Sequence, residues 1–285
     1  MTRVTVITGA GGMGVPTAAN LAADGPVVLF DNQQARLDDA ASALAAESIT
    51  PTLVLGDVTD PDDVDGLFTA AAALGQIRSV VHTAGVSPSM GTARYIARIT
   101  ALGTLTVNET LLRLADQQPD SIAEGAAVVN VASMAAHLIP AELIPLDLFP
   151  TAVGDPQAFV DALLTSFEHY PEQALPGLAY AVTKAFVKWY SSAQAERFSA
   201  AGIRIVSVSP GSIETEMGRL EAESGAGAMV EGAAIPRWGR PQEMADLFAF
   251  CVSDRAGYLT GTDILNDGGV VASMTERARA AALSG

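Results

Sequence analysis

Near its start the chain reads Val4-Thr5-Val6-Ile7-Thr8-Gly9-Ala10-Gly11-Gly12-Met13-Gly14, a short apolar segment that runs directly into a cluster of glycines. The apolar segment predicts a buried strand, and residues 15–23 predict a helix after the turn. Gly9, Gly11 and Gly14 have the spacing G-x-G-x-x-G, which permits a tight turn, close approach of backbone to a pyrophosphate, and close packing of helix on strand. The helix N-terminus adds amide donors and a positive dipole end. The stretch therefore predicts a dinucleotide-binding unit.

Short β-branched or aliphatic runs recur along the rest of the chain, separated by alanine- and leucine-rich segments of helical length. They lie at residues 27–30, 53–55, 80–81, 128–131, 203–208 and 263–265. This alternation predicts an α/β fold, with a single Rossmann-type, doubly wound parallel sheet of about seven strands and helices on both faces. The rhythm breaks once, at about 138–177, where six prolines interrupt short apolar stretches. We interpret this as an insertion on one βα unit of a single domain that spans residues 1–285.

Composition excludes several classes of protein. Hydrophobic residues make up 49% of the 285 residues and charged residues 17%, which excludes a disordered chain of low hydrophobicity. The 16 basic and 32 acidic residues give a net charge of −16, with no dense basic cluster, so neither nucleic acid nor an anionic membrane is an expected partner. One cysteine and three scattered histidines predict neither a disulfide nor a metal site. Without an export signal or a long apolar run, we expect a cytoplasmic protein.

Acidic residues follow the second and third predicted strands. Asp31 stands 17 positions after Gly14, where a carboxylate can accept hydrogen bonds from the adenosine ribose and repel a 2′-phosphate. NAD(H) is therefore favoured over NADP(H), although Asp31 could instead cap the following helix. Asp57 could meet the adenine or serve only as a turn residue. Asn32 and Val58, their neighbours in sequence, are included in the predicted cofactor site.

Tyr180 and Lys184 are spaced i, i+4 in Tyr-Ala-Val-Thr-Lys, at the start of a predicted helix that runs to about Ala200. This spacing places both side chains on one helix face. An adjacent ammonium favours the phenolate and lowers the tyrosine pKa from about 10, so the phenol can exchange a proton with a substrate oxygen. Such a pair is frequent by chance and gains its meaning from the glycine turn and the strand pattern.

With these motifs in this order, the sequence resembles the short-chain dehydrogenase/reductase family over nearly its whole length. The further matching stretches are Thr83-Ala84-Gly85, Val129-Asn130-Val131-Ala132-Ser133, Ser209-Pro210-Gly211, Arg237-Trp238-Gly239-Arg240-Pro241 and Leu259-Thr260-Gly261 with Asp267-Gly268-Gly269. The run from Ala132 to Leu138, the long insert and then Leu178-Ala179-Tyr180 are similar to the bacterial 3α-hydroxysteroid dehydrogenase/carbonyl reductase subgroup.

The resemblance implies an NAD-dependent dehydrogenase that interconverts a secondary alcohol and a ketone, in a homotetramer or homodimer. Tyr180 would be the acid/base, Lys184 would lower its pKa and hold the nicotinamide ribose, and Ser133 would bind the substrate oxygen. Residues at about 212–236 correspond to the substrate loop. The residues expected at the cofactor are Gly9, Gly11, Gly12, Met13, Gly14, Asp31, Asn32, Asp57, Val58, Thr83, Ala84, Gly85, Tyr180, Lys184, Pro210, Gly211, Ile213 and Thr215.

The subgroup suggests a bulky apolar substrate, steroid-like or alicyclic. The apolar insertion between Ser133 and Tyr180 would then be a lid over the substrate, or else a brace or subunit interface. The alternatives for the function are a reductase of small ketones or 3-oxoacyl thioesters, and a catalytically weak NAD-binding sensor or assembly protein.

Three features depart from the family pattern, and the first is the separation of 47 positions between Ser133 and Tyr180, which the insertion makes longer than usual. The glycine turn is one residue shorter than the usual T-G-x-x-x-G-x-G, and Thr100 stands where an asparagine precedes a glycine, here Gly103, by three residues. That asparagine anchors a water in a proton relay, so threonine is expected to slow or reroute proton exchange.

Overall fold

The computed structural model describes residues 2–222 and 227–284. Seven parallel strands form one sheet in the order β3-β2-β1-β4-β5-β6-β7. The strands are β1 (Arg3–Thr8), β2 (Val27–Asp31), β3 (Thr52–Leu55), β4 (Gln76–His82), β5 (Ile122–Val131), β6 (Arg204–Pro210) and β7 (Asp263–Asn266). The predicted Rossmann-type sheet is confirmed, and each of the seven predicted runs lies on a different strand.

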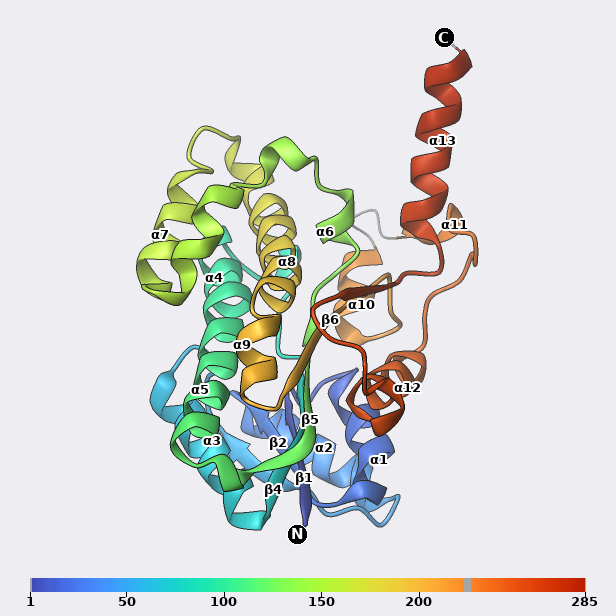
Figure 1. Ribbon diagram of the computed structural model, residues 1–285. Helices are drawn as coiled ribbons and strands as arrows, with labels where there is room; N and C mark the ends of the chain where they lie inside the picture. The colour runs from blue at the N-terminus through green and yellow to red at the C-terminus, as the bar shows by residue number, and fades with distance from the viewer. Residues whose placement is uncertain (1, 223–226, 285) are drawn as a thin grey trace.

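Helices cover both faces of the sheet (Figure 1). One face carries α1 (Gly14–Leu21), α2 (Gln34–Ala45) and α12 (Pro241–Val252), and the other carries α3 (Pro61–Leu74), α5 (Gly103–Gln117) and α8 (Leu175–Ala193). The remaining helices are α4 (Ala93–Ala97), α6 (Ala135–Leu138), α7 (Pro156–Thr165), α9 (Ala195–Ala200), α10 (Glu216–Glu221), α11 (Gly227–Glu231) and α13 (Val270–Ser284). Within the described residues, no helix is long and apolar enough to cross a membrane.

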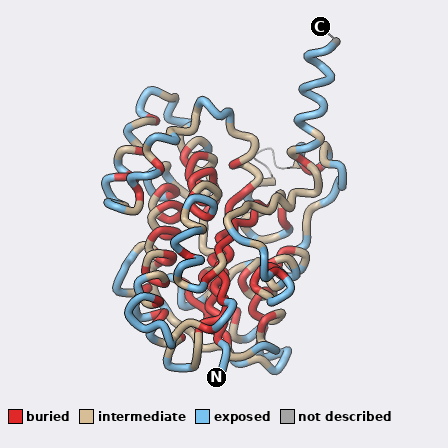
Figure 2. The backbone as a smooth tube through the Cα atoms, viewed as in Figure 1, coloured by how far each residue is buried: buried red, intermediate tan, exposed pale blue. Residues whose placement is uncertain are grey.

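The two helix layers bury the strands, because apolar side chains on both faces of a parallel sheet need cover. Every residue of β2 is buried, as is every residue of β1 after the first. Figure 2 shows this burial along the centre of the molecule, whereas α13 projects from the body and is exposed along most of its length.

The strand order places a crevice at the end of β1. This strand pairs with β2 on one side and with β4 on the other, so the chain reverses its direction across the sheet there. Ligands of open α/β sheets bind outside the carboxyl ends of the strands at such a point. The glycine turn, Asp31 and Thr83 follow or end these three strands, and all three reach the same crevice.

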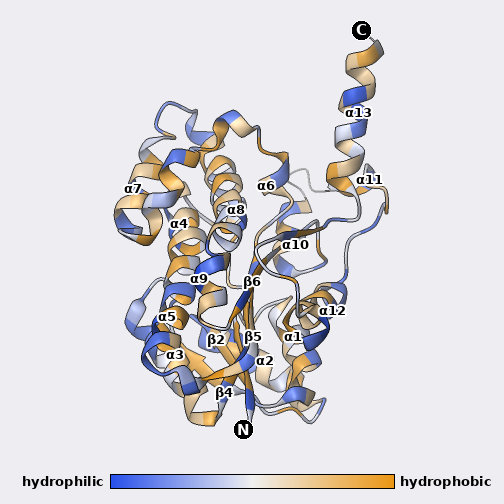
Figure 3. Cartoon of the chain, in the orientation of Figure 1, coloured by the Kyte–Doolittle hydropathy of each residue, from blue (hydrophilic) through white to orange (hydrophobic). Residues whose placement is uncertain are grey.

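The insertion between β5 and α8 folds into short helical turns and α7. Phe149 and Phe159 are fully buried, with ring centroids 5.3 and 4.7 Å from that of Phe186 on α8. The Phe149 ring also lies 5.5 Å from Trp189. Figure 3 shows hydrophobic residues on α7 and α8, the two helices that this cluster joins. The insertion thus packs on the flank of the α8 layer.

Two predicted helix boundaries were wrong. The helix after the glycine turn ends at Leu21 and continues as a 3₁₀ turn over Ala22–Asp24. The helix with the Tyr180 motif begins earlier, at Leu175, and is interrupted at Gln194 before α9. Pro176 sits in its first turn, where the missing N–H has no cost, so this proline starts the helix instead of ending the insertion.

Candidate active site

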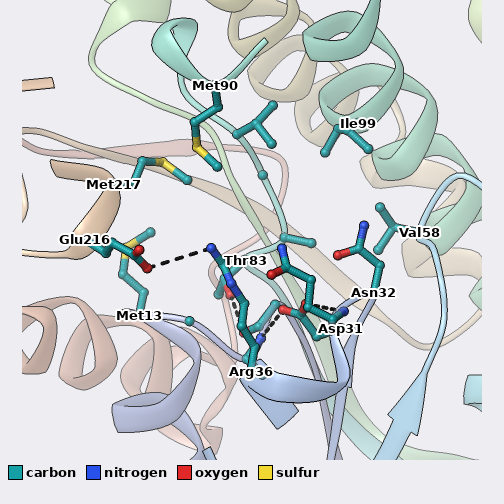
Figure 4. A pocket seen from close by; sticks show the side chains of 18 of the residues that line it. Met13, Asp31, Asn32, Arg36, Val58, Thr83, Met90, Ile99, Glu216 and Met217 are labelled. Atoms are coloured by element: carbon teal, nitrogen blue, oxygen red, sulfur yellow. Dashed lines mark hydrogen bonds and ion pairs between the residues drawn. The ribbon is translucent and has the colours of Figure 1, made fainter. Parts of the chain in front are cut away.

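A cavity of about 350 Å³ lies at the carboxyl ends of β1, β2 and β4. Twelve of the predicted cofactor residues line it: Gly9, Gly11, Gly12, Met13, Asp31, Asn32, Asp57, Val58, Thr83, Ala84, Gly85 and Thr215. Thr215, from the predicted substrate loop, closes it from the other side. We refer to it as the dinucleotide cavity (Figure 4).

The glycine turn has the shape expected of a phosphate cradle. Gly9 has φ +88°, a conformation that side chains other than hydrogen rarely adopt. A Cβ on Gly14 would stand 1.9 Å from the carbonyl oxygen of Gly9, so the close contact of α1 with the turn requires glycine. Gly14 itself does not line the cavity. The turn one residue shorter than the family pattern therefore still presents open backbone at the N-terminus of α1, which fits a pyrophosphate.

Asp31 is 8% exposed at the end of β2. Its Oδ2 accepts a hydrogen bond from the Ala10 amide at 2.9 Å, and its Oδ1 accepts one from the Gln33 amide at 3.0 Å. A carboxylate has about four acceptor positions, so two remain for a ribose diol. The helix-cap alternative is not what the structure shows, because α2 begins at Gln34 with Gln33 as its N-cap and no side-chain cap bond. Asp57 both lines the cavity and accepts from the Thr59 amide at 2.8 Å, as a turn residue does.

A second cavity, of about 300 Å³, adjoins the first. The two share Met13, Thr83, Gly85, Val86, Thr215 and Met217. Ser133, Tyr180, Lys184, Pro210, Gly211 and Ile213 line the second cavity and not the first. Most of its remaining wall is apolar: Val86, Pro88, Met134, Ala135, Leu138, Met217, Met229 and Trp238. We refer to it as the substrate-side cavity.

The insertion contributes little to this wall. Leu138 and Gly177, at its two ends, line the substrate-side cavity, whereas its buried aromatic residues pack on α8. The interpretation of the insertion as a lid is therefore wrong for the described residues, and the brace alternative agrees with the packing. The segment that does cover the cavities is α10, with its neighbours Thr215 and Met229. Residues 223–226 of the predicted substrate loop lie outside the described part of the chain.

Tyr180, Lys184 and Ser133 come together from two elements. Lys184 is buried on α8, and its ammonium donates to the carbonyl of Val131, at the end of β5, at 2.7 Å. It lies 5.8 Å from the centre of the Tyr180 ring. Ser133 follows β5 and is 8% exposed, with its hydroxyl accepting from the Ala135 amide at 3.2 Å.

The electrostatics of this group differ from the expectation. Burial raises the pKa of Tyr180, the Ser133 hydroxyl acts in the opposite direction, and the negative charge of Glu221 adds to the increase. Burial also lowers the pKa of Lys184 to about 8. The predicted lowering of the Tyr180 pKa by Lys184 is not seen, because desolvation of the phenolate dominates and the ammonium is directed to the Val131 carbonyl.

Buried polar contacts hold the strands beneath the site. Asn130 on β5 exchanges side-chain hydrogen bonds with Asn108 on α5, at 2.9 and 3.2 Å. His137, four residues after Ser133, pairs with Asp263 on β7 at 2.7 Å and so ties α6 to the sheet. Thr100 lies in a π-helical turn, Arg98–Leu102, and its buried hydroxyl has no hydrogen-bond partner within the described residues.

Several cavity residues were not predicted. Arg36 and Glu216 line the dinucleotide cavity and approach each other to 3.8 Å across it (Figure 4). Glu221 lines the substrate-side cavity. Arg36 follows Asp31 by five positions on α2 and could have been found from the spacing. The two glutamates depend on how the loop after β6 folds, and no sequence pattern marks them.

Comparisons with known proteins agree with this geometry. A family model described as "short chain dehydrogenase" matches residues 3–144, and one described as "Enoyl-(Acyl carrier protein) reductase" matches residues 164–271. This chain belongs to the short-chain dehydrogenase/reductase family. Its relatives include dehydrogenases named for hydroxycyclohexanecarboxylate and galactitol, in agreement with an oxidoreductase acting on CH–OH groups.

Several relatives of this short-chain dehydrogenase/reductase match almost end to end. It is 29% identical to cis-4-hydroxycyclohexanecarboxylate dehydrogenase of Sinomonas cyclohexanicum, over 95% of this chain and 97% of the relative. It is 28% identical to the short-chain dehydrogenase/reductase bsc3 of Alternaria brassicicola, over 95% and 96%. A crystal structure of a short-chain type dehydrogenase/reductase from Mycobacterium marinum has 26% identity and a TM-score of 0.71, over 94% and 95%.

Proposed function

We propose that this protein is an NAD(H)-dependent oxidoreductase that interconverts a secondary alcohol and a ketone on a bulky, apolar, alicyclic or steroid-like substrate. The observation that carries the proposal is the junction of the two cavities. Tyr180, Ser133 and Lys184 line an apolar cavity that shares Met13, Thr83, Gly85, Val86, Thr215 and Met217 with the glycine-lined one.

The cofactor fits the residues present. The glycine turn and the N-terminus of α1 would hold the pyrophosphate, Asp31 the adenosine ribose, and Lys184 the nicotinamide ribose. When bound, the nicotinamide supplies or accepts the hydride. Asp31 supports NAD(H) because its buried carboxylate has acceptor capacity left for two hydroxyls and would repel a 2′-phosphate.

Tyr180 has the role of proton donor to the substrate oxygen in reduction, and of acceptor in oxidation. Its raised pKa keeps the phenol protonated before reaction, which suits a donor. Ser133 would donate to the same oxygen and orient it. In oxidation the phenol must lose its proton, and a charged Lys184 nearby stabilises the phenolate that results.

The apolar wall supports a hydrophobic ring substrate. Its methionines adapt to irregular shapes, and Trp238 and Leu138 supply flat and branched apolar surface. The relative from Sinomonas cyclohexanicum is named for a substituted cyclohexanol, which supports the alicyclic choice. The resemblance to the hydroxysteroid subgroup, assembly into a dimer or tetramer and a cytoplasmic location stay predictions.

The test is cofactor absorbance at 340 nm with purified protein, NAD⁺ or NADP⁺, and a panel of cyclic secondary alcohols that includes hydroxysteroids. We expect turnover with NAD⁺, and a loss of at least about 1,000-fold in kcat for Tyr180→Phe, which removes the acid/base but keeps the ring. NADH fluorescence should show that the variant still binds cofactor. Tight NADH binding without turnover of any alcohol or ketone by the wild type would favour the sensor alternative.

A further inference from the structure

Glu221 brings a carboxylate into a cavity whose wall is otherwise mostly apolar. It is the last residue of α10, and it lines the substrate-side cavity together with Ser133 and Tyr180. Its Oε1 accepts hydrogen bonds from Ser89, from the amide at 3.3 Å and from the hydroxyl. These bonds fix the carboxylate beside the turn Pro88–Met90, and Oε2 has no hydrogen-bond partner among the described residues. One acceptor oxygen is thus available to a ligand.

The positive and the negative charge in this cavity come from two different elements. Of the described residues that line it, only Lys184 and Glu221 carry a formal charge. The Lys184 ammonium is buried, bonded to Val131 and close to Gly85, which also lines the dinucleotide cavity. Glu221 comes instead from the covering segment, on the substrate side. The part of the cavity away from the cofactor is therefore negative.

The charge of Glu221 also acts on Tyr180, the proposed acid/base. The negative charge of Glu221 is among the causes that raise the pKa of the Tyr180 phenol. Glu221 is thus close enough for its charge to act on Tyr180, although it comes from α10 and Tyr180 comes from α8. The other acid of α10, Glu216, lines the dinucleotide cavity and approaches Arg36, so the two ends of this helix serve different cavities.

We infer that Glu221 is a specificity-determining residue that selects substrates bearing a hydrogen-bond donor or a positive charge away from the carbinol, and disfavours anionic ones. This inference rests on the proposed function, because it takes the substrate-side cavity as the place where the alcohol binds. An anionic substituent would meet a fixed carboxylate in a partly desolvated cavity, where like charges repel more strongly than in water. A hydroxyl, amide or ammonium would donate to Oε2.

The inference separates this protein from some functions of its relatives. The relative from Sinomonas cyclohexanicum is named for a carboxylate substrate, which Glu221 would repel. Acyl thioesters on phosphate-bearing carriers are negatively charged, so a chain of net charge −16 would repel them. The charge of the carrier argues against the alternative of a 3-oxoacyl thioester reductase.

The experiment uses three cyclohexanols that differ in charge: 4-hydroxycyclohexanecarboxylate, its carboxamide and 4-aminocyclohexanol. Turnover with NAD⁺ is measured for the wild type, Glu221→Gln and Glu214→Gln. Glu214 is the matched control, since it is an exposed acid of the same loop that lines neither cavity. In parallel, binding of cyclohexanecarboxylate, cyclohexanecarboxamide and cyclohexylammonium to each protein with NADH is measured by calorimetry.

We expect the wild type to favour the amide and the amine over the carboxylate in kcat/KM and in affinity. Glu221→Gln should narrow that preference by about tenfold, the size of one unfavourable charge contact, and Glu214→Gln should leave it unchanged. Equal preference in wild type and Glu221→Gln, by turnover or by calorimetry, overturns the inference. Calorimetry measures the preference for ligand charge without requiring turnover. A failure of the proposed function is recognised separately, by turnover that survives Tyr180→Phe.

Discussion

Two backbone amides hold the Asp31 carboxylate in place, and we expect cofactor choice to depend on this residue. Asp31→Ser removes the negative charge and leaves the Ala10 and Gln33 amides as free donors, with Arg36 lining the same cavity. A 2′-phosphate would then meet donors and a cation where it now meets a carboxylate. We expect the ratio of kcat/KM for NADP⁺ to that for NAD⁺ to rise by at least about tenfold.

Steady-state kinetics with both cofactors on one alcohol measure this ratio. Asp39→Ser is the matched control, because Asp39 lines the same cavity from an exposed position on α2. If the ratio of kcat/KM for NADP⁺ to that for NAD⁺ is unchanged in Asp31→Ser, the carboxylate does not discriminate between the two cofactors.

Thr100 is the residue at which the site departs most from the family pattern. Its side chain is buried without a hydrogen-bond partner in the described part of the chain, and a buried polar atom of this kind needs a water or costs free energy. The surrounding π-helical turn widens the helix at this point. Thr100→Asn adds an amide that can anchor a relay water, so we expect kcat to rise by up to about tenfold and its pH profile to change.

Turnover of the variant is measured from pH 6 to pH 10 beside its melting temperature, which separates a relay effect from a packing defect. If both kcat and the pH profile equal those of the wild type, a relay through this position is ruled out.

At the scale of elements, we expect the buried aromatic residues of the insertion to act through stability and not through substrate binding. Phe159 is fully buried on α7, in contact with the rings of Phe149 and Phe186. Phe159→Ala leaves a cavity there, and we expect it to lower the free energy of unfolding by about 3 to 5 kcal/mol while KM stays unchanged.

Urea unfolding and steady-state kinetics test this expectation together. Leu146→Ala, at a side chain that is 54% exposed in the same insertion, should change stability by less than about 0.5 kcal/mol. Leu138→Ala should instead raise KM, because Leu138 lines the substrate-side cavity. A KM that rises severalfold in Phe159→Ala would restore the lid interpretation.

The strands could be predicted because each depends on a local signal. Runs of β-branched residues such as residues 203–208 read as buried strands wherever they occur, and the glycine spacing fixes which strand ends at the phosphate cradle. Right-handed crossovers leave only a few possible strand orders, and the structure shows which one is adopted. The i, i+4 spacing predicts that Tyr180 and Lys184 share a helix face, whereas the expectation that Ser133 joins them rests on the resemblance to the family.

Elements whose position depends on tertiary contacts could not be predicted. Helix α10 is six residues long and is fixed by contacts distant in sequence, from Thr215 against Gly12 to Glu221 against Ser89. The insertion has an apolar composition that suits a lid and a brace equally well, and only the packing of its aromatic residues on α8 decides between them. The direction in which the pKa of Tyr180 shifts depends on burial, and the i, i+4 spacing gives no information on burial.

For the whole molecule, His82 couples the stability of the sheet to pH. It is buried at the end of β4, where its Nδ1 lies 2.7 Å from the hydroxyl of Thr8 on β1. Burial, and secondarily the charge of Lys184, lowers its pKa from 6.5 to about 3. The unfolded chain therefore binds a proton at this residue between these two values, whereas the folded chain does not.

Because of this difference in bound protons, the part of the free energy of unfolding that His82 contributes falls as the pH falls. The contribution of neutral His82 to stability is complete above pH 6.5 and is lost as the pH falls toward 3, at up to about 1.4 kcal/mol per pH unit. Protonation of carboxylates acts differently, because it reduces the repulsion within a chain of net charge −16. Total stability against pH is therefore a sum of opposing effects, and the difference between two variants isolates His82.

We expect His82→Asn, which keeps a buried hydrogen-bonding group but cannot titrate, to lose less stability than the wild type between pH 6.5 and pH 4.5. Urea unfolding at 0.5-unit steps of pH measures both curves, and His169→Asn, at an exposed histidine, should follow the wild type. A lower stability of the asparagine variant at pH 8 does not affect the test, because the prediction concerns how the free energy of unfolding changes with pH. Parallel curves for wild type and His82→Asn would mean that the pKa of His82 is the same in the folded and the unfolded chain, and would contradict the prediction.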